Sequence, residues 1–117
     1  MTPTEFVDLV RSSVQDEAVK GSISLVEKPP GRRPDADLVA LSSWYNALDA
    51  AGKAMARRLC SLTARGAVFG FLTLLDGSRI VRLSDDDDAH FELRFVDQAE
   101  STQLAAGLDG PALHELL

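Results

Sequence analysis

The longest apolar run of the chain is Ala67-Val-Phe-Gly-Phe-Leu-Thr-Leu-Leu75, and its conformation separates two possible folds. A run that is apolar on every side must be buried, and periodicity does not distinguish a buried helix from a buried strand. The following Asp76-Gly77 suits either a hairpin turn or the end of a helix. We predict a buried helix, in which Gly66 and Gly70 would let another element approach closely.

Upstream of this run the sequence predicts helices. Thr2-Pro3-Thr4-Glu5 supplies a cap, a first-turn proline and a capping-box glutamate, so a helix is expected over residues 3–20, with Lys20-Gly21 as its end. Three prolines and a glycine predict a loop over residues 28–34. Apolar side chains at helical spacing then predict helices over residues 36–47 and 50–65, or one bent helix, ending at Arg65-Gly66.

Downstream of the run the pattern changes to strands. Residues 79–83 are β-prone, and residues 91–96 alternate apolar and mostly polar side chains. Residues 84–89, which contain four consecutive aspartates, join them, and this predicts an antiparallel hairpin. A third strand near residues 102–105 is a further possibility, and residues 111–117 predict a short closing helix.

These elements predict a single α+β domain over residues 1–117. N-terminal helices would pack on a small antiparallel β-hairpin or three-stranded meander, closed by a short C-terminal helix. The helical part is expected at about residues 3–75, the β part at about 78–105 and the closing helix at about 111–117.

Charge is distributed unevenly along the chain. The net charge is −6 overall, but residues 1–34 balance, residues 35–66 carry +1 and residues 67–117 carry −7. This balance argues against nucleic-acid binding and against attachment to an anionic membrane, both of which need a basic face. The acidic excess either keeps the protein soluble or forms a face that docks a basic partner.

Cysteine usage and the N-terminus indicate the compartment. Cys60 is the only cysteine, so no internal disulfide can form, as expected in a reducing environment. The first residues lack the basic and apolar regions of a signal peptide, and the 67–75 run is too short to span a membrane. We expect a cytoplasmic protein, although export by a leaderless route stays open.

A search for chemistry finds no catalytic, cofactor-binding or metal-binding motif. Asp85-Asp86-Asp87-Asp88 with His90 lacks the glycine and the distant glutamate of a calcium loop, and is better explained as a charged hairpin tip. Cys60 is expected to be a small buried apolar residue, and His114 to lie at a helix end. The chain is therefore not expected to be an enzyme, and no cofactor is predicted.

The adjacent Trp44 and Tyr45 are the only residues of their types. One interpretation places Trp44 in the core with Tyr45 at its edge. The alternative is an aromatic patch on a partner-binding surface, where these residue types are enriched. The candidate partner-binding residues are therefore Asp85, Asp86, Asp87, Asp88, Glu92, Trp44 and Tyr45.

Several segments together resemble a known group of proteins. They are Ser43-Trp44-Tyr45-Asn46-Ala47-Leu48, Val68-Phe69-Gly70-Phe71-Leu72, Leu75-Asp76-Gly77, the acidic hairpin, and Leu113-His114-Glu115-Leu116. Over roughly residues 40–117 the chain resembles small uncharacterised bacterial proteins, some of which are similar to the immunity proteins of antibacterial toxins. The resemblance implies a helix-then-hairpin fold and a protein-binding role, and it assigns no functional residue.

Three functional hypotheses follow. The first is a protein-interaction module without catalysis, for example an immunity or adaptor protein that binds a basic protein partner through an acidic C-terminal face. The second is a self-associating structural domain, such as a homodimer that buries the 67–75 run. The third is a small ligand-binding or enzymatic domain with an unrecognised pocket near that run.

Overall fold

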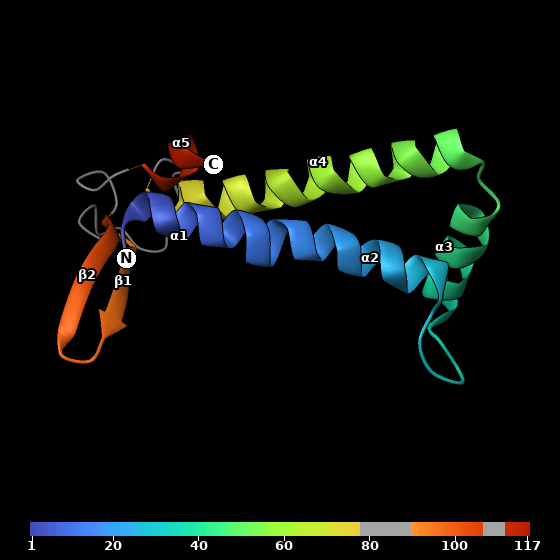
Figure 1. Ribbon diagram of the computed structural model, residues 1–117, viewed down its shortest axis with the longest axis horizontal. Helices are drawn as coiled ribbons and strands as arrows, with labels where there is room; N and C mark the ends of the chain where they lie inside the picture. The colour runs from blue at the N-terminus through green and yellow to red at the C-terminus, as the bar shows by residue number, and fades with distance from the viewer. Residues whose placement is uncertain (78–89, 107–111) are drawn as a thin grey trace, which may run out of the picture. The chain divides into compact units, whose positions relative to one another are not determined.

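The computed structural model describes residues 1–77, 90–106 and 112–117, and within them the fold is α+β (Figure 1). The chain divides into two compact units: unit 1 comprises Met1–Ser12 and Gly66–Leu117, and unit 2 comprises Ser13–Arg65. The elements are α1 (Pro3–Val10), the π-helical segment η1 (Arg11–Asp16), α2 (Glu17–Glu27), α3 (Ala36–Asn46), α4 (Ala50–Leu75), β1 (Glu92–Asp97), β2 (Glu100–Ala106) and α5 (Leu113–Leu116).

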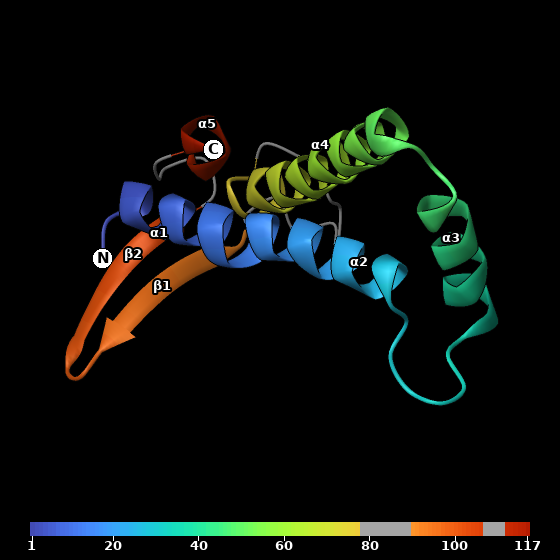
Figure 2. The same cartoon turned by 45° about the vertical axis from the view of Figure 1, so that its right-hand side comes forward.

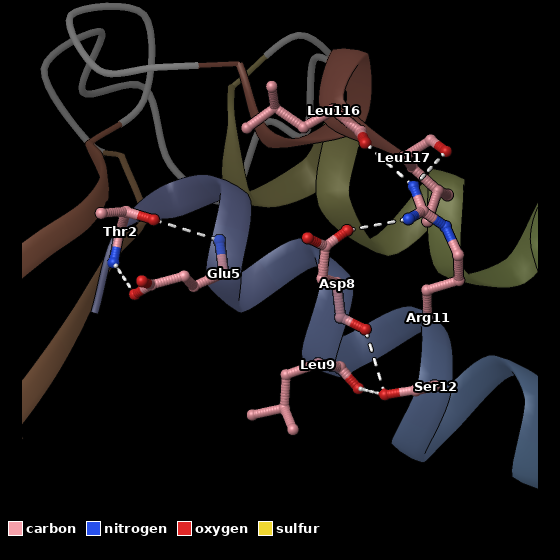
Figure 3. Close-up of polar contacts among 8 residues, drawn as sticks. All are labelled: Thr2, Glu5, Asp8, Leu9, Arg11, Ser12, Leu116 and Leu117. Carbon is pink, nitrogen blue, oxygen red and sulfur yellow. Dashed lines mark hydrogen bonds and ion pairs between the residues drawn. The ribbon is translucent and has the colours of Figure 1, made fainter.

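The first helical stretch begins as its sequence predicts. The backbone N–H of Glu5 donates to Thr2 Oγ1 at 3.1 Å, and the Thr2 N–H donates to Glu5 Oε2 at 2.9 Å, which completes the capping box (Figure 3). The predicted end at Gly21 is wrong, because helical structure runs through η1 and α2 to Glu27. A helical glycine costs only about 1 kcal/mol, and burial of Ile23 favours continuation. Pro29 and Pro30 then prevent further extension.

Helices α3 and α4 are two separate helices and not one bent helix, which was the other predicted alternative. Asp35 caps α3 by accepting a hydrogen bond from the Asp37 N–H at 2.8 Å. Helix α4 continues through Gly66, so the predicted end there is wrong, and it includes residues 67–75. The helical conformation of that run is therefore confirmed.

The predicted burial of the 67–75 run is only partly correct. Leu72 and Thr73 are buried, but Phe69 is exposed and Phe71 has 60% of its surface exposed. The core of unit 1 covers a single side of α4, the side that also carries Val68 and Leu75. An apolar helix surface beyond that contact area therefore stays in solvent.

The sheet has two strands in the described part of the chain. β1 and β2 pair antiparallel, from Glu92 opposite Ala106 to Asp97 opposite Glu100, with an irregularity between Leu93 and Arg94 (Figure 2). The strand predicted at 91–96 is confirmed as β1, and the segment predicted as a third strand near 102–105 is β2, its partner. The predicted strand 79–83 and the connection 84–89 lie outside the described residues, so a three-stranded meander is not shown.

The core of unit 1 is built from four elements. Val7 of α1, Leu72 of α4, Ala105 of β2 and Leu113 of α5 are each at most 1% exposed and form one cluster. The partly buried residues that pack around it are Phe6, Val68, Leu75, Leu93 and Leu117. The closing helix predicted at 111–117 is confirmed as the shorter α5.

Arg11, the C-cap residue of α1, binds the C-terminal end of α5. The guanidinium of Arg11 donates to the carbonyl oxygens of Leu116 at 3.1 Å and Leu117 at 2.7 Å, and it also pairs with Asp8 at 2.8 Å (Figure 3). Positive charge at the C-terminal end of a helix is favourable because carbonyl oxygens are left unpaired there. Arg11 thus links segments separated by 105 residues.

Unit 2 is held by fewer buried groups. Helix α2 packs against α3, and the Asn46 amide donates to the Glu27 carbonyl at 3.2 Å and to Ser42 Oγ at 3.2 Å. Its buried residues are Ile23, Ser42 and Tyr45. Little apolar surface is therefore removed from water in this unit.

Candidate partner-binding surface

Three large apolar side chains form an exposed row on α4 in unit 2. Met55, Leu59 and Leu62 have 60%, 62% and 69% of their surface exposed. Their i, i+4, i+7 spacing places them on one face of the helix. We call these three residues the α4 row.

The opposite face of α4 carries the contacts within unit 2. Lys53 Nζ lies 5.6 Å from the centre of the Tyr45 ring, and the Arg57 guanidinium pairs with Glu27 at 3.3 Å. Lys53 and Arg57 are roughly half a helical turn from the α4 row in angle. The helix is therefore oriented by charged and aromatic contacts, which leave the apolar side chains of the row outside.

Two arginines border the α4 row. Arg58 precedes Leu62 by four residues and Arg65 follows it by three, so both lie along the same edge. Arg58 Nη1 is 3.7 Å from Met55 Sδ, and both guanidinium groups are on exposed residues. Neither arginine forms an ion pair with a described residue. The row is thus an apolar surface with an unpaired positive edge.

The structure separates Trp44 from Tyr45. Trp44 is 53% exposed on α3, whereas Tyr45 is 1% exposed, so the interpretation that put Trp44 in the core and Tyr45 at the edge is wrong. Adjacent helical residues point about 100° apart, and it is Tyr45 that turns inward. Of the two aromatic candidates, Trp44 is accessible to a partner.

The Tyr45 hydroxyl is buried without a hydrogen bond. The pKa of the neighbouring Arg57 guanidinium is raised, mainly by its interaction with the Tyr45 hydroxyl and to a smaller extent by its interaction with Glu27. The hydroxyl and the guanidinium nevertheless do not reach hydrogen-bonding geometry, and no other described group pairs with this oxygen.

Glu92, the candidate on β1, is already paired. Its carboxylate contacts His90 Nε2 at 3.3 Å and Arg94 Nη2 at 3.2 Å. The hydrogen bond with His90, then that with Arg94, lowers the pKa of Glu92. The candidates Asp85, Asp86, Asp87 and Asp88 lie outside the described residues.

Sequence reasoning missed a buried polar cluster around Asp76. This side chain is 2% exposed, and its carboxylate accepts hydrogen bonds from the backbone N–H groups of Leu113 and His114, both at 2.9 Å. It also contacts His114 Nδ1 at 2.6 Å, and the Phe69 ring packs edge-on against the imidazole at 5.4 Å. Asp76-Gly77 indicated only a hairpin turn or the end of a helix, since partners 37 and 38 residues away leave no local pattern.

The Asp76 cluster has a structural explanation. It supplies the acceptors that the N-terminal end of α5 requires, and in the described part of the chain no hydroxyl or thiol is bonded to His114. Among the described residues, no group of three or more His, Cys, Asp or Glu side chains could hold a metal ion. Cys60, expected to be buried, is half-buried.

Length and composition give α4 one further property. It is long and apolar enough to cross a membrane, and 11% of its most apolar window is buried. Lys53, Arg57, Arg58 and Arg65 are spaced along the same helix. Length and composition alone assign no membrane role.

Comparisons with protein-family models, with curated proteins and with solved structures each found no match.

Proposed function

We propose that the chain is a non-catalytic protein-interaction module and that the α4 row is its contact surface. The observation that carries the proposal is the exposure of Met55, Leu59 and Leu62 on one helix face. Apolar side chains at i, i+4, i+7 are the anchors with which helices dock into apolar grooves. Burying them against a partner would release about 1.5–3 kcal/mol each before the costs of association.

The acidic C-terminal face remains a separate prediction. Its main residues, Asp85–Asp88, lie outside the described part, and Glu92 shares its charge with His90 and Arg94. Inhibition of a basic partner, as an immunity protein would achieve, therefore draws less support from the described geometry than docking through α4 does.

Site-specific photo-crosslinking tests the proposed function. A photoreactive phenylalanine analogue replaces Leu59 in the full chain inside the native cells, and a matched control carries it at Val96, an exposed position on β1. We expect one dominant adduct from position 59, identified by mass spectrometry and weakened by the additional substitution Leu62→Ser. Equal adducts from both positions, or none from position 59, would refute the proposal.

A further inference from the structure

The charge of α4 indicates what kind of partner the α4 row fits. Residues 50–75 contain Lys53, Arg57, Arg58 and Arg65 and no acidic side chain. Arg57 is engaged by Glu27 and Lys53 lies over Tyr45. Arg58 and Arg65 therefore remain available for contact with a partner. The net charge of the whole chain is −6. The sign of this surface is therefore opposite to that of the protein as a whole.

We propose, on the basis of the proposed function, that the α4 row binds an acidic amphipathic helix of another protein. Such a helix would place apolar side chains against Met55, Leu59 and Leu62 and carboxylates against Arg58 and Arg65. Arginine suits this role because its planar guanidinium binds carboxylates in a bidentate geometry.

The same charges disfavour a second copy of α4 as the occupant. Pairing two α4 rows would bring arginines together without any carboxylate from either helix. Like charges at neighbouring positions of paired helices are destabilising. A symmetric α4–α4 dimer thus lacks the complementarity that an acidic helix supplies.

The shape of the α4 row favours a helix over a lipid surface. Its spacing makes a narrow seam, whereas a helix lying in a membrane interface needs a wide apolar face. The cations border one edge, while Ala56 and Thr63 occupy the other. An anionic bilayer would contact both edges of the α4 row equally. A partner helix packed at an angle can instead place its carboxylates along the single edge that carries Arg58 and Arg65.

A selection from a displayed peptide library tests whether the partner helix is acidic. The full chain selects from a library of helical peptides with a leucine seam and with Glu, Lys or Gln at the flanking positions. We expect Glu to be enriched at these positions and the selected peptides to bind less tightly at high salt. The variant Arg58→Glu/Arg65→Glu should weaken binding roughly tenfold. Arg32→Glu/Arg33→Glu, with the same change in net charge at two exposed loop positions, should not.

The outcomes separate this inference from the proposed function. Selected peptides without charge preference, whose binding is lost in Leu59→Ser/Leu62→Ser, would overturn the acidic partner and leave docking through the α4 row intact. If no peptide is selected, both fail. Binding to phosphatidylserine vesicles that depends on Arg58 and Arg65, or a dimer in sedimentation that Leu62→Ser dissociates, would overturn the acidic helix in favour of a membrane or a second copy. Circular dichroism establishes that each variant is folded.

Discussion

Unit 1 and unit 2 differ in how far their apolar residues form a shared core. In unit 1, side chains from α1, α4, β2 and α5 meet in one cluster, and polar groups hold both ends of α5: Asp76 at its start and Arg11 at its end. In unit 2, only Ile23 and Tyr45 are buried among the large apolar side chains. Those that stay exposed are Val14, Leu25, Val39, Leu41, Trp44, Met55, Leu59 and Leu62.

This difference separates a region that is stabilised by its own core from one whose apolar surface is available. Soluble monomers rarely leave large contiguous apolar patches in water, and such patches commonly mark interaction sites. Unit 1 encloses a cluster that four elements share, although Phe69, Phe71 and Val96 stay exposed there. Unit 2, which the structure describes throughout, has no such cluster and carries the exposed α4 row, so the candidate partner-binding surface lies in unit 2.

The largest expected contrast is between two leucines of the same helix. Leu72→Ala should lower the free energy of unfolding by about 2–5 kcal/mol, because it removes a buried side chain from the cluster of unit 1. Leu59→Ala on the exposed row should change it by less than about 0.5 kcal/mol. Urea titrations followed by circular dichroism measure both. Equal losses would mean that the α4 row is buried in solution.

A smaller contrast concerns two carboxylates. Asp76→Asn should cost about 1–3 kcal/mol, since it removes a buried charge that accepts two backbone hydrogen bonds and exchanges one acceptor oxygen for an NH₂ group. Asp8→Asn breaks only an exposed ion pair with Arg11 and should cost less than about 1 kcal/mol. Chemical denaturation of the two variants provides the comparison. An Asp76 effect no larger than that of Asp8 would contradict the role given to Asp76.

Two buried hydroxyls sharpen the comparison further. Thr73 Oγ1 in unit 1 donates to the Gly70 carbonyl at 2.7 Å, so Thr73→Val should cost about 1 kcal/mol. The Tyr45 hydroxyl in unit 2 has no hydrogen bond, so Tyr45→Phe should be neutral or slightly stabilising. Thermal unfolding of both variants measures the difference. A clear loss of stability in Tyr45→Phe would show that this hydroxyl is paired in solution.

The smallest expected effect is the pH dependence of the Glu92 contacts. Because the pKa of Glu92 is lowered in the folded state, its contribution is present above the unfolded value and is lost as the pH falls through the folded value. The Tm difference between the wild type and Glu92→Gln should therefore be slight near pH 7 and vanish once the pH has fallen below the lowered pKa of Glu92 in the folded state. Asp97→Asn, at the other end of β1, is the control. A difference that grows at low pH would contradict the sign.

Local sequence signals predicted the elements that depend on nearest neighbours. The Thr2 capping box and the alternation in β1 both follow from contacts within a few residues. Stop signals at Gly21 and Gly66 failed, because a glycine lowers helix stability only slightly and neither position meets a neighbouring group that requires one.

The sequence by itself determined the α+β class, the start of the first helix and the strand at β1, and it left residues 67–75 open between helix and strand. Tertiary structure alone decided which side of each helix is buried: Tyr45 turns inward rather than Trp44, Leu72 is enclosed while Leu59 is exposed, and Asp76 meets His114 across 38 residues. The physical reason is range. Helix caps and hydrophobic periodicity act over one or two helical turns. Burial of a side chain depends on which distant segment of the chain packs against it, and the local sequence does not specify that segment.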